Sequence, residues 1–206
     1  MSVPPDSALF AASYAPERSR LTTFFRALLV IPHAIALFVY GIAAYVAVVI
    51  AWFAILFTGR YPSGLYDFVA GLHRWAARVG GYLYLLTDEY PPFDGDEHAE
   101  YPVRLVLGPP KEQYSRLLTF FRAILYIPVA IIGYFLGALA GLVCVASWFV
   151  ILVTGRQPQG LQDAIAFGLG YTSRGGVYAS LLTEAFPPFS NGPSEAVGTT
   201  PAGLAG

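Results

Sequence analysis

The sequence predicts an all-α integral membrane protein built from two tandem copies of one unit. Apolar residues make up 56% of the 206 residues and charged residues only 12%, whereas about a quarter of the residues in an average soluble domain are charged. The mean hydropathy is +0.56, and 16% of the residues are aromatic, which is typical of chains whose aromatic side chains line bilayer interfaces. The same motifs occur twice, since Trp52 and its neighbours return at Trp148, 96 positions later.

The duplication runs without an insertion through both copies. Residues 19–32 (SRLTTFFRALLVIP) match 115–128 (SRLLTFFRAILYIP), and residues 85–93 (LLTDEYPPF) match 181–189 (LLTEAFPPF). A fixed period of this kind indicates one structural unit used twice. The predicted organisation is an N-terminal segment (1–16), a first membrane repeat (17–93), an acidic linker with one short strand (94–112), a second membrane repeat (113–189) and a disordered tail (190–206).

The first half of each repeat allows two interpretations. Residues 21–31 place apolar side chains at helical spacing and are followed by Pro32, while 34–57 carry no charge and are long enough to cross about 30 Å of hydrocarbon. In one interpretation, 21–31 lie at the interface or begin a span whose Arg26 snorkels, Pro32 is an elbow, and 34–57 cross once. In the other, 34–57 form a hairpin of two short spans that turns near Tyr40.

Matching arginines favour the hairpin. The positive-inside tendency requires both repeats to have the same orientation, and this needs an even number of crossings in each. We therefore expect about two membrane-crossing or membrane-inserted helices plus an amphipathic helix per repeat, about four crossings in total, and both termini in the cytoplasm. The matching pairs are Arg20 and Arg116, Arg26 and Arg122, Arg60 and Arg156, and Arg78 and Arg174.

A Thr-Gly-Arg turn ends the long apolar segment of each repeat. Glycine after a helix is typical of a C-terminal cap, and arginine beside it faces the negative end of the helix dipole. The following Pro-x-Gly then turns the chain into another helix. The predicted structural turn residues are Gly59, Arg60, Pro62 and Gly64 in the first repeat and Gly155, Arg156, Pro158 and Gly160 in the second.

The third part of each repeat is predicted to be an amphipathic helix. Apolar side chains form one stripe over residues 65–86, and polar side chains lie on the opposite face. This helix either lies on the membrane or spans it with the polar face turned inward. The polar face is either a solvated interfacial surface, or a polar track or anionic-lipid site repeated in each half. The candidate polar or lipid-contacting residues are Asp67, Arg74, Arg78, Asp163 and Arg174.

The sequence offers little for catalysis. It lacks the phosphate-binding Gly-x-x-x-x-Gly-Lys, the Gly-x-Ser-x-Gly of acyl transfer and the His-Glu-x-x-His of zinc proteases. His33, His73 and His98 are scattered, and Cys144 has no second cysteine. A net charge of −1 argues against nucleic acid as a partner. We therefore expect neither an enzyme nor a cofactor or metal site.

Three motifs resemble those of a bacterial membrane-protein family known only as a domain of unknown function. They are FRALLVIPH, AWFAILFTGRYPSGL and LLTDEYPPF, all within residues 25–93. The resemblance implies an uncharacterised inner-membrane protein, of a two-copy type typical of actinobacteria, and brings no activity with it. The second repeat departs from the pattern where Val129 replaces His33 and Gln157 replaces Tyr61.

These features predict a non-catalytic accessory or scaffold subunit of a larger assembly in the cell membrane. The alternatives are a small transporter or channel with a repeated Asp/Arg polar track, and an anionic-lipid-binding protein. The expected partners are the lipid bilayer, anionic lipids and a larger membrane-protein complex.

Overall fold

The computed structural model describes residues 6–189. The tail 190–206, which we expected to be disordered, lies outside the described residues, as do residues 1–5. The elements in chain order are β1 (Ala8–Ala12), α1 (Arg20–Leu29), α2 (Ile31–Thr58), α3 (Ser63–Leu83), β2 (Val103–Leu107), α4 (Arg116–Phe120), α5 (Arg122–Thr154) and α6 (Gln159–Ala179).

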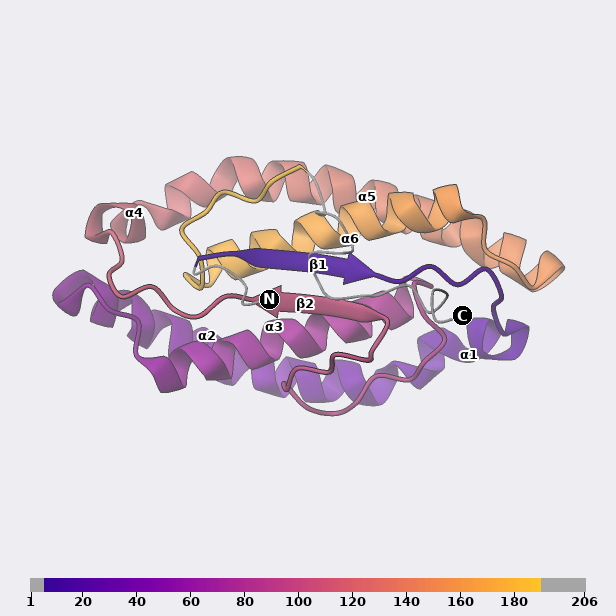
Figure 1. The fold of residues 1–206 in the computed structure, drawn as a ribbon, viewed down its shortest axis with the longest axis horizontal. Coiled ribbons are helices and arrows are strands. Elements are labelled where there is room, and N and C mark those ends of the chain that lie inside the picture. Colours follow the sequence, from indigo (N-terminus) through magenta and orange to yellow (C-terminus); the bar gives the residue numbers. More distant parts are fainter. Residues whose placement is uncertain (1–5, 190–206) are drawn as a thin grey trace, which may run out of the picture.

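The elements form layers (Figure 1). A two-stranded antiparallel ribbon lies in front, with β1 and β2 paired from Ala8↔Leu107 to Ala12↔Val103. Behind it lie α3 and α6, and the long helices α2 and α5 are further back along the two outer edges. The short strand that we expected before Gly108 is β2. Its partner β1 comes from the N-terminal segment, for which we predicted no strand.

The hairpin that we expected within each apolar segment is wrong. Helix α2 runs from Ile31 to Thr58 without a turn at Tyr40, and α5 runs from Arg122 to Thr154 with Pro128 inside it. An uninterrupted helix satisfies the backbone groups within the apolar run, apart from the carbonyl opposite Pro128 in α5, whereas a turn would leave several groups without partners. The interpretation with an elbow describes the first repeat better, because α1 ends at Leu29, directly before α2. The elbow is at Val30 and not at Pro32, which lies in the first turn of α2 where its missing N–H costs no hydrogen bond.

Both long helical segments have the length and composition of membrane-inserted helices. Residues 20–58 and 122–154 each contain a window with a mean hydropathy of 2.5, of which only 17% is buried within the protein. The core helix of a soluble protein would be mostly buried. The length, composition and low burial of these segments therefore favour insertion into a membrane.

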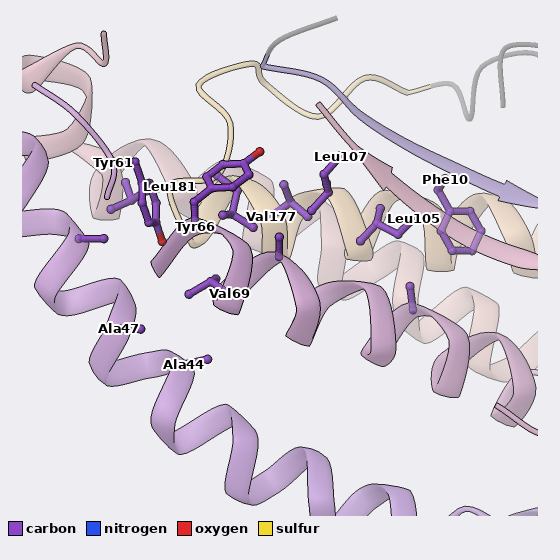
Figure 2. Close-up of a cluster of buried hydrophobic side chains, with 14 of the residues drawn as sticks. Phe10, Ala44, Ala47, Tyr61, Tyr66, Val69, Leu105, Leu107, Val177 and Leu181 are labelled. Atoms are coloured by element: carbon purple, nitrogen blue, oxygen red, sulfur yellow. The ribbon is translucent and has the colours of Figure 1, made fainter. Parts of the chain in front are cut away.

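The two repeats share one core. Helix α3 packs on α2 and on β2, α6 packs on α5 and on β1, and α3 and α6 contact each other. Figure 2 shows part of this cluster, to which α3 contributes Val69, α6 contributes Val177 and β2 contributes Leu105 and Leu107. Burial of each such side chain contributes about 1.5 to 3 kcal/mol. The repeats are therefore parts of a single folded body.

Candidate functional site

Arg78 is a buried clamp on the acidic linker. Its side chain is 3% exposed and donates hydrogen bonds to the carbonyls of Asp94 and Asp96. It also pairs with the Asp94 carboxylate at 3.0 Å, and His98 contacts the same carboxylate at 2.8 Å. Burial lowers the pKa of the Arg78 guanidinium, and the Asp94 charge opposes that shift. The sequence placed Arg78 on an open polar face, but here it holds the linker against α3.

Of the other candidate residues in the first repeat, Arg74 contacts the linker and Asp67 is exposed to solvent. Arg74 pairs with the Glu97 carboxylate at 3.1 Å, so it also contacts the linker. Asp67 is exposed at the start of α3, and no ion pair joins it to either arginine among the described residues. The structure thus brings Arg74 and Arg78 together with the linker and leaves Asp67 apart.

Arg174 has a similar role in the second repeat. It is 2% exposed and donates to the carbonyl of Pro188 at 3.1 Å, so it holds the segment after α6 against that helix. Burial lowers its pKa to about 10. Asp163 is exposed near the start of α6, and the described residues show no ion pair between Asp163 and Arg174. The polar face therefore does not form a continuous track in either repeat.

The Thr-Gly-Arg turn is a helix cap, as predicted. Gly59 and Gly155 have φ of +74° and +71°, a left-handed conformation that glycine adopts without strain. Thr58 Oγ1 donates to the helix carbonyl four residues earlier at 2.7 Å and accepts from the Arg60 backbone N–H at 3.1 Å. Thr154 makes the same two bonds in the second repeat.

In the Pro-x-Gly motif that follows, the proline is the N-cap of the next helix, whereas the glycine position has room for a side chain. Pro62 and Pro158 are the N-cap residues of α3 and α6. Gly64 and Gly160 lie within the first turn of these helices, and a Cβ on either would meet no atom within 4 Å. Arg60 and Arg156 are exposed beside the turns.

Each turn is bound by the opposite repeat, which the sequence did not reveal. The carbonyl of Gly59 accepts from the backbone N–H of Tyr114 at 2.8 Å, and the carbonyl of Gly155 accepts from that of Arg18 at 2.9 Å. Arg116 also donates to the carbonyl of Phe57 at 3.2 Å. Tyr114 lies 96 positions after Arg18, so the exchange is reciprocal and pseudo-symmetric.

Two tryptophans strengthen this exchange. Trp52 of α2 donates its indole N–H to the carbonyl of Thr119 at 3.0 Å, and Trp148 of α5 donates to the carbonyl of Thr23 at 3.1 Å. Each indole also stacks on a phenylalanine of the opposite repeat, Phe120 or Phe24. The sequence carries the tryptophan and its phenylalanine partner at matching positions in both copies, 96 residues apart. We name these reciprocal turn and tryptophan contacts the repeat interlock.

An arginine of α1 and its counterpart in α5 have different surroundings. Arg26 is 2% exposed, so it does not snorkel. It donates to the carbonyls of Tyr82 and Thr87, pairs with Asp88, and lies over the Tyr82 ring. Arg122 lies over the Tyr178 ring with 4.0 Å between Cζ and the ring centroid. No carboxylate among the described residues pairs with it.

His33 is enclosed in an aromatic box. It is fully buried, stacks on Phe93 with centroids 3.7 Å apart, and has Tyr90 and Trp75 around it. The Trp75 indole donates to Nδ1 at 3.1 Å. An indole can only donate, so Nδ1 accepts, and the ring is neutral with its proton on Nε2. This geometry fixes a packing role for His33 beside Pro32.

The second repeat has a cavity at the same place. Val129 occupies the position of His33, and a pocket of about 140 Å³ opens beside it. The buried Tyr171 hydroxyl has no hydrogen-bond partner among the described residues. The pocket is lined by Tyr126, Val129, Ala130, Gly133, Tyr134, Tyr171, Thr172 and Gly175. Across residues 6–189, no group of three or more His, Cys, Asp or Glu side chains could hold a metal ion.

One protein-family model, described as a domain of unknown function (DUF4389), matches residues 20–94 and again residues 116–191. The chain belongs to this family. The two matches are consistent with tandem DUF4389 copies. No curated protein and no solved structure is significantly similar to the chain.

The interlock thus joins two DUF4389 copies within one polypeptide. Each copy supplies the segment that binds the Thr-Gly-Arg turn of the other. In the part of the chain that the structure describes, these contacts recur in both copies. The aromatic box around His33 does not recur, because a pocket lies beside Val129 at the matching place.

Proposed function

We propose that this protein is a non-catalytic accessory or scaffold protein of the cell membrane, which presents a rigid polar face to a partner protein. One observation carries the proposal: the outer surfaces of α2 and α5 are apolar and exposed, while the ribbon lies on the other side of α3 and α6 and the acidic linker lies along the edge formed by α2 and α3. An exposed apolar surface of this extent favours contact with lipid or another apolar surface.

The shared core and the interlock support a scaffold role. Both copies of the repeat are held in one body by paired contacts at the two turns and the two tryptophans. The linker is fixed by Arg74 and Arg78, and it leaves Asp96 and Glu100 exposed. A rigid, acidic surface suits a partner with complementary basic side chains.

The test is purification of the tagged protein from its own membranes in mild detergent. We expect a stable partner whose yield falls when Asp96 and Glu100 are replaced by lysine, because these side chains are exposed on the polar face. Glu112→Lys is the matched control, since Glu112 is exposed but follows β2 and lies outside the acidic stretch 94–100. Equal partner yield from all three forms, or no partner enriched over an unrelated membrane protein, would contradict the proposal.

Binding of anionic lipid is a second candidate function. Four exposed arginines occur at matching positions beside the two turns, and arginine pairs readily with phosphate. The transporter alternative has less support, because Arg78 and Arg174 bind backbone carbonyls and do not line a continuous polar track. Flux of ions or solutes in liposomes would favour a transporter. The lipid-contacting arginines are Arg20, Arg60, Arg116 and Arg156.

A further inference from the structure

Exposed apolar side chains gather on the helices of the outer layer. Phe57 is 77% exposed and Val153 is 76% exposed, values that large apolar side chains seldom reach in contact with water. The other large exposed side chains of α2 and α5 repeat this pattern along the whole length of both helices. They include Ile35, Phe38, Ile42, Tyr45, Val49 and Phe53 in α2, and Ile127, Ile131, Tyr134, Phe135, Leu142 and Phe149 in α5.

The acidic linker lies beside α2, well inside the ends of that helix. Gly95 packs against Gly71 so closely that a Cβ on Gly95 would lie 2.7 Å from the Gly71 Cα. A Cβ on Gly71 would in turn lie 2.9 Å from the Tyr40 hydroxyl, and Tyr40 donates to the carbonyl of Phe68. Tyr40 lies roughly 14 Å along α2, whose full length is roughly 42 Å at 1.5 Å per residue. The linker therefore lies beside the central part of α2 and away from its ends.

A perpendicular orientation in the membrane conflicts with this arrangement. If α2 crossed the bilayer, about 30 Å of its length would lie in hydrocarbon, and the level of Tyr40 would lie within it. The irregular linker would then be at that depth, with Asp96, Glu97 and Glu100 exposed. The β1–β2 ribbon has two open edges and runs along α3 and α6 at the same depth. Neither exposed charges nor open sheet edges are tolerated in lipid.

An in-plane orientation removes the conflict. With α2 and α5 parallel to the membrane surface, their apolar faces lie in hydrocarbon, and the ribbon and linker lie in water. The ends of the long helices carry exposed arginines at both ends of the molecule. Arg60 and Arg116 are close to the turn at Gly59, and Arg20 and Arg156 are close to the turn at Gly155. All four can reach phosphate groups of one leaflet.

We infer that the outer layer formed by α1, α2, α4 and α5 is embedded flat in one leaflet of an anionic bilayer, so that neither long helix crosses it. This inference rests on the proposed membrane attachment and specifies its geometry. Length and composition permit a crossing by either helix. The acidic linker decides against such a crossing, because it lies beside α2 well inside the ends of that helix.

Labelling of single cysteines tests this orientation. In a Cys144→Ala background, cysteine replaces Arg20, Arg60, Glu97 or Phe38 in the full-length chain. Sealed spheroplasts and inside-out vesicles are treated with a membrane-impermeant maleimide. We expect Arg20→Cys, Arg60→Cys and Glu97→Cys to be labelled from the same side, and Phe38→Cys to be labelled from neither.

The outcomes separate the orientation from the attachment. Labelling of Arg20→Cys and Arg60→Cys from opposite sides means that α2 crosses the bilayer, which overturns the flat orientation but keeps the membrane protein. Recovery of the protein in the soluble fraction, with Phe38→Cys labelled, overturns membrane attachment itself. Protection of Phe38→Cys together with its oxidation to a disulfide-linked dimer means that a second copy covers this face, and this also overturns the inference.

Discussion

The two repeats have the same frame and different interiors. In the first, Arg26 pairs with Asp88, and His33 fills an aromatic box. In the second, Arg122 lies over Tyr178 and forms no ion pair with a carboxylate of residues 6–189, and a pocket of about 140 Å³ lies beside Val129. The turns and tryptophan contacts are nearly equal in both. The comparison teaches that the contacts joining the repeats constrain the sequence of each copy, while the space behind each long helix tolerates change.

The first test of the comparison replaces Arg26 and Arg122, one at a time. Arg26→Met should lower the free energy of unfolding by about 3 kcal/mol, because it leaves the partly buried Asp88 without its partner. Arg122→Met should change it by less than about 1 kcal/mol, because no carboxylate is left behind. Unfolding in detergent micelles, followed by tryptophan fluorescence, measures both. Arg60→Met is the exposed control. Equal losses at Arg26 and Arg122 would mean that the salt bridge does not distinguish the repeats.

The second test concerns the contact between α3 and α6. His73 lies against Gly176 and bonds to Ser180, while its counterpart Leu169 lies against Gly80. Burial lowers the pKa of His73 to about 4. Between the ordinary pKa near 6.5 and this value, the unfolded chain binds a proton that the folded chain does not. Stability is therefore fully present above about pH 6.5 and falls as the pH drops toward 4.

We expect this loss to be about 2 kcal/mol, because His73 as a residue is only half-buried and solvent screens part of the charge. His73→Leu copies the second repeat and should remove this component, so unfolding midpoints of the two forms should differ in pH dependence between 4 and 6.5. Carboxylates titrate equally in both forms, and the difference isolates His73. Parallel curves would show that His73 is not shielded from solvent in the folded protein.

The third test asks whether the two turns are equivalent. Gly59→Ala and Gly155→Ala should each lower stability by about 1.5 kcal/mol, because both glycines have positive φ. The two losses should agree closely, since the surrounding bonds are reciprocal. Gly64→Ala, in a helical position with open space, should be neutral or slightly stabilising. A loss at only one of the turns would break the symmetry that the structure shows.

The smallest expected effect comes from the pocket. Gly133 occupies the position of Leu37, and a Cβ there would meet Thr172 and Tyr171 at 3.9 Å. Gly133→Leu should therefore fill part of the pocket and stabilise the protein by about 1 kcal/mol more than Gly141→Leu. Gly141 has no neighbour within 4 Å and controls for helix propensity. Thermal unfolding in detergent compares the two. An equal or smaller gain at Gly133 would mean that the pocket is not filled by the added side chain.

The sequence predicted much of the fold and less of the candidate site. The cap at Gly59 was predictable because its signal is local, and the boundaries of the repeats followed from their fixed period. The partners of Arg78 were not predictable, because Asp94 and Asp96 approach it only when the linker folds back over α3. A helical projection shows which side chains share a face, and it contains no information about what later covers that face.

The sequence alone determined the apolar class of the chain, its duplication and the start and end of most helices, because composition, periodicity and caps act over a few residues. Only the tertiary structure decided that each apolar segment is one continuous helix and that each repeat binds the turn of the other. It also showed that the acidic linker lies beside α2, well inside the ends of that helix. The last two features depend on contacts between residues tens of positions apart, such as Trp52 with Thr119, and such contacts form only when the whole chain packs.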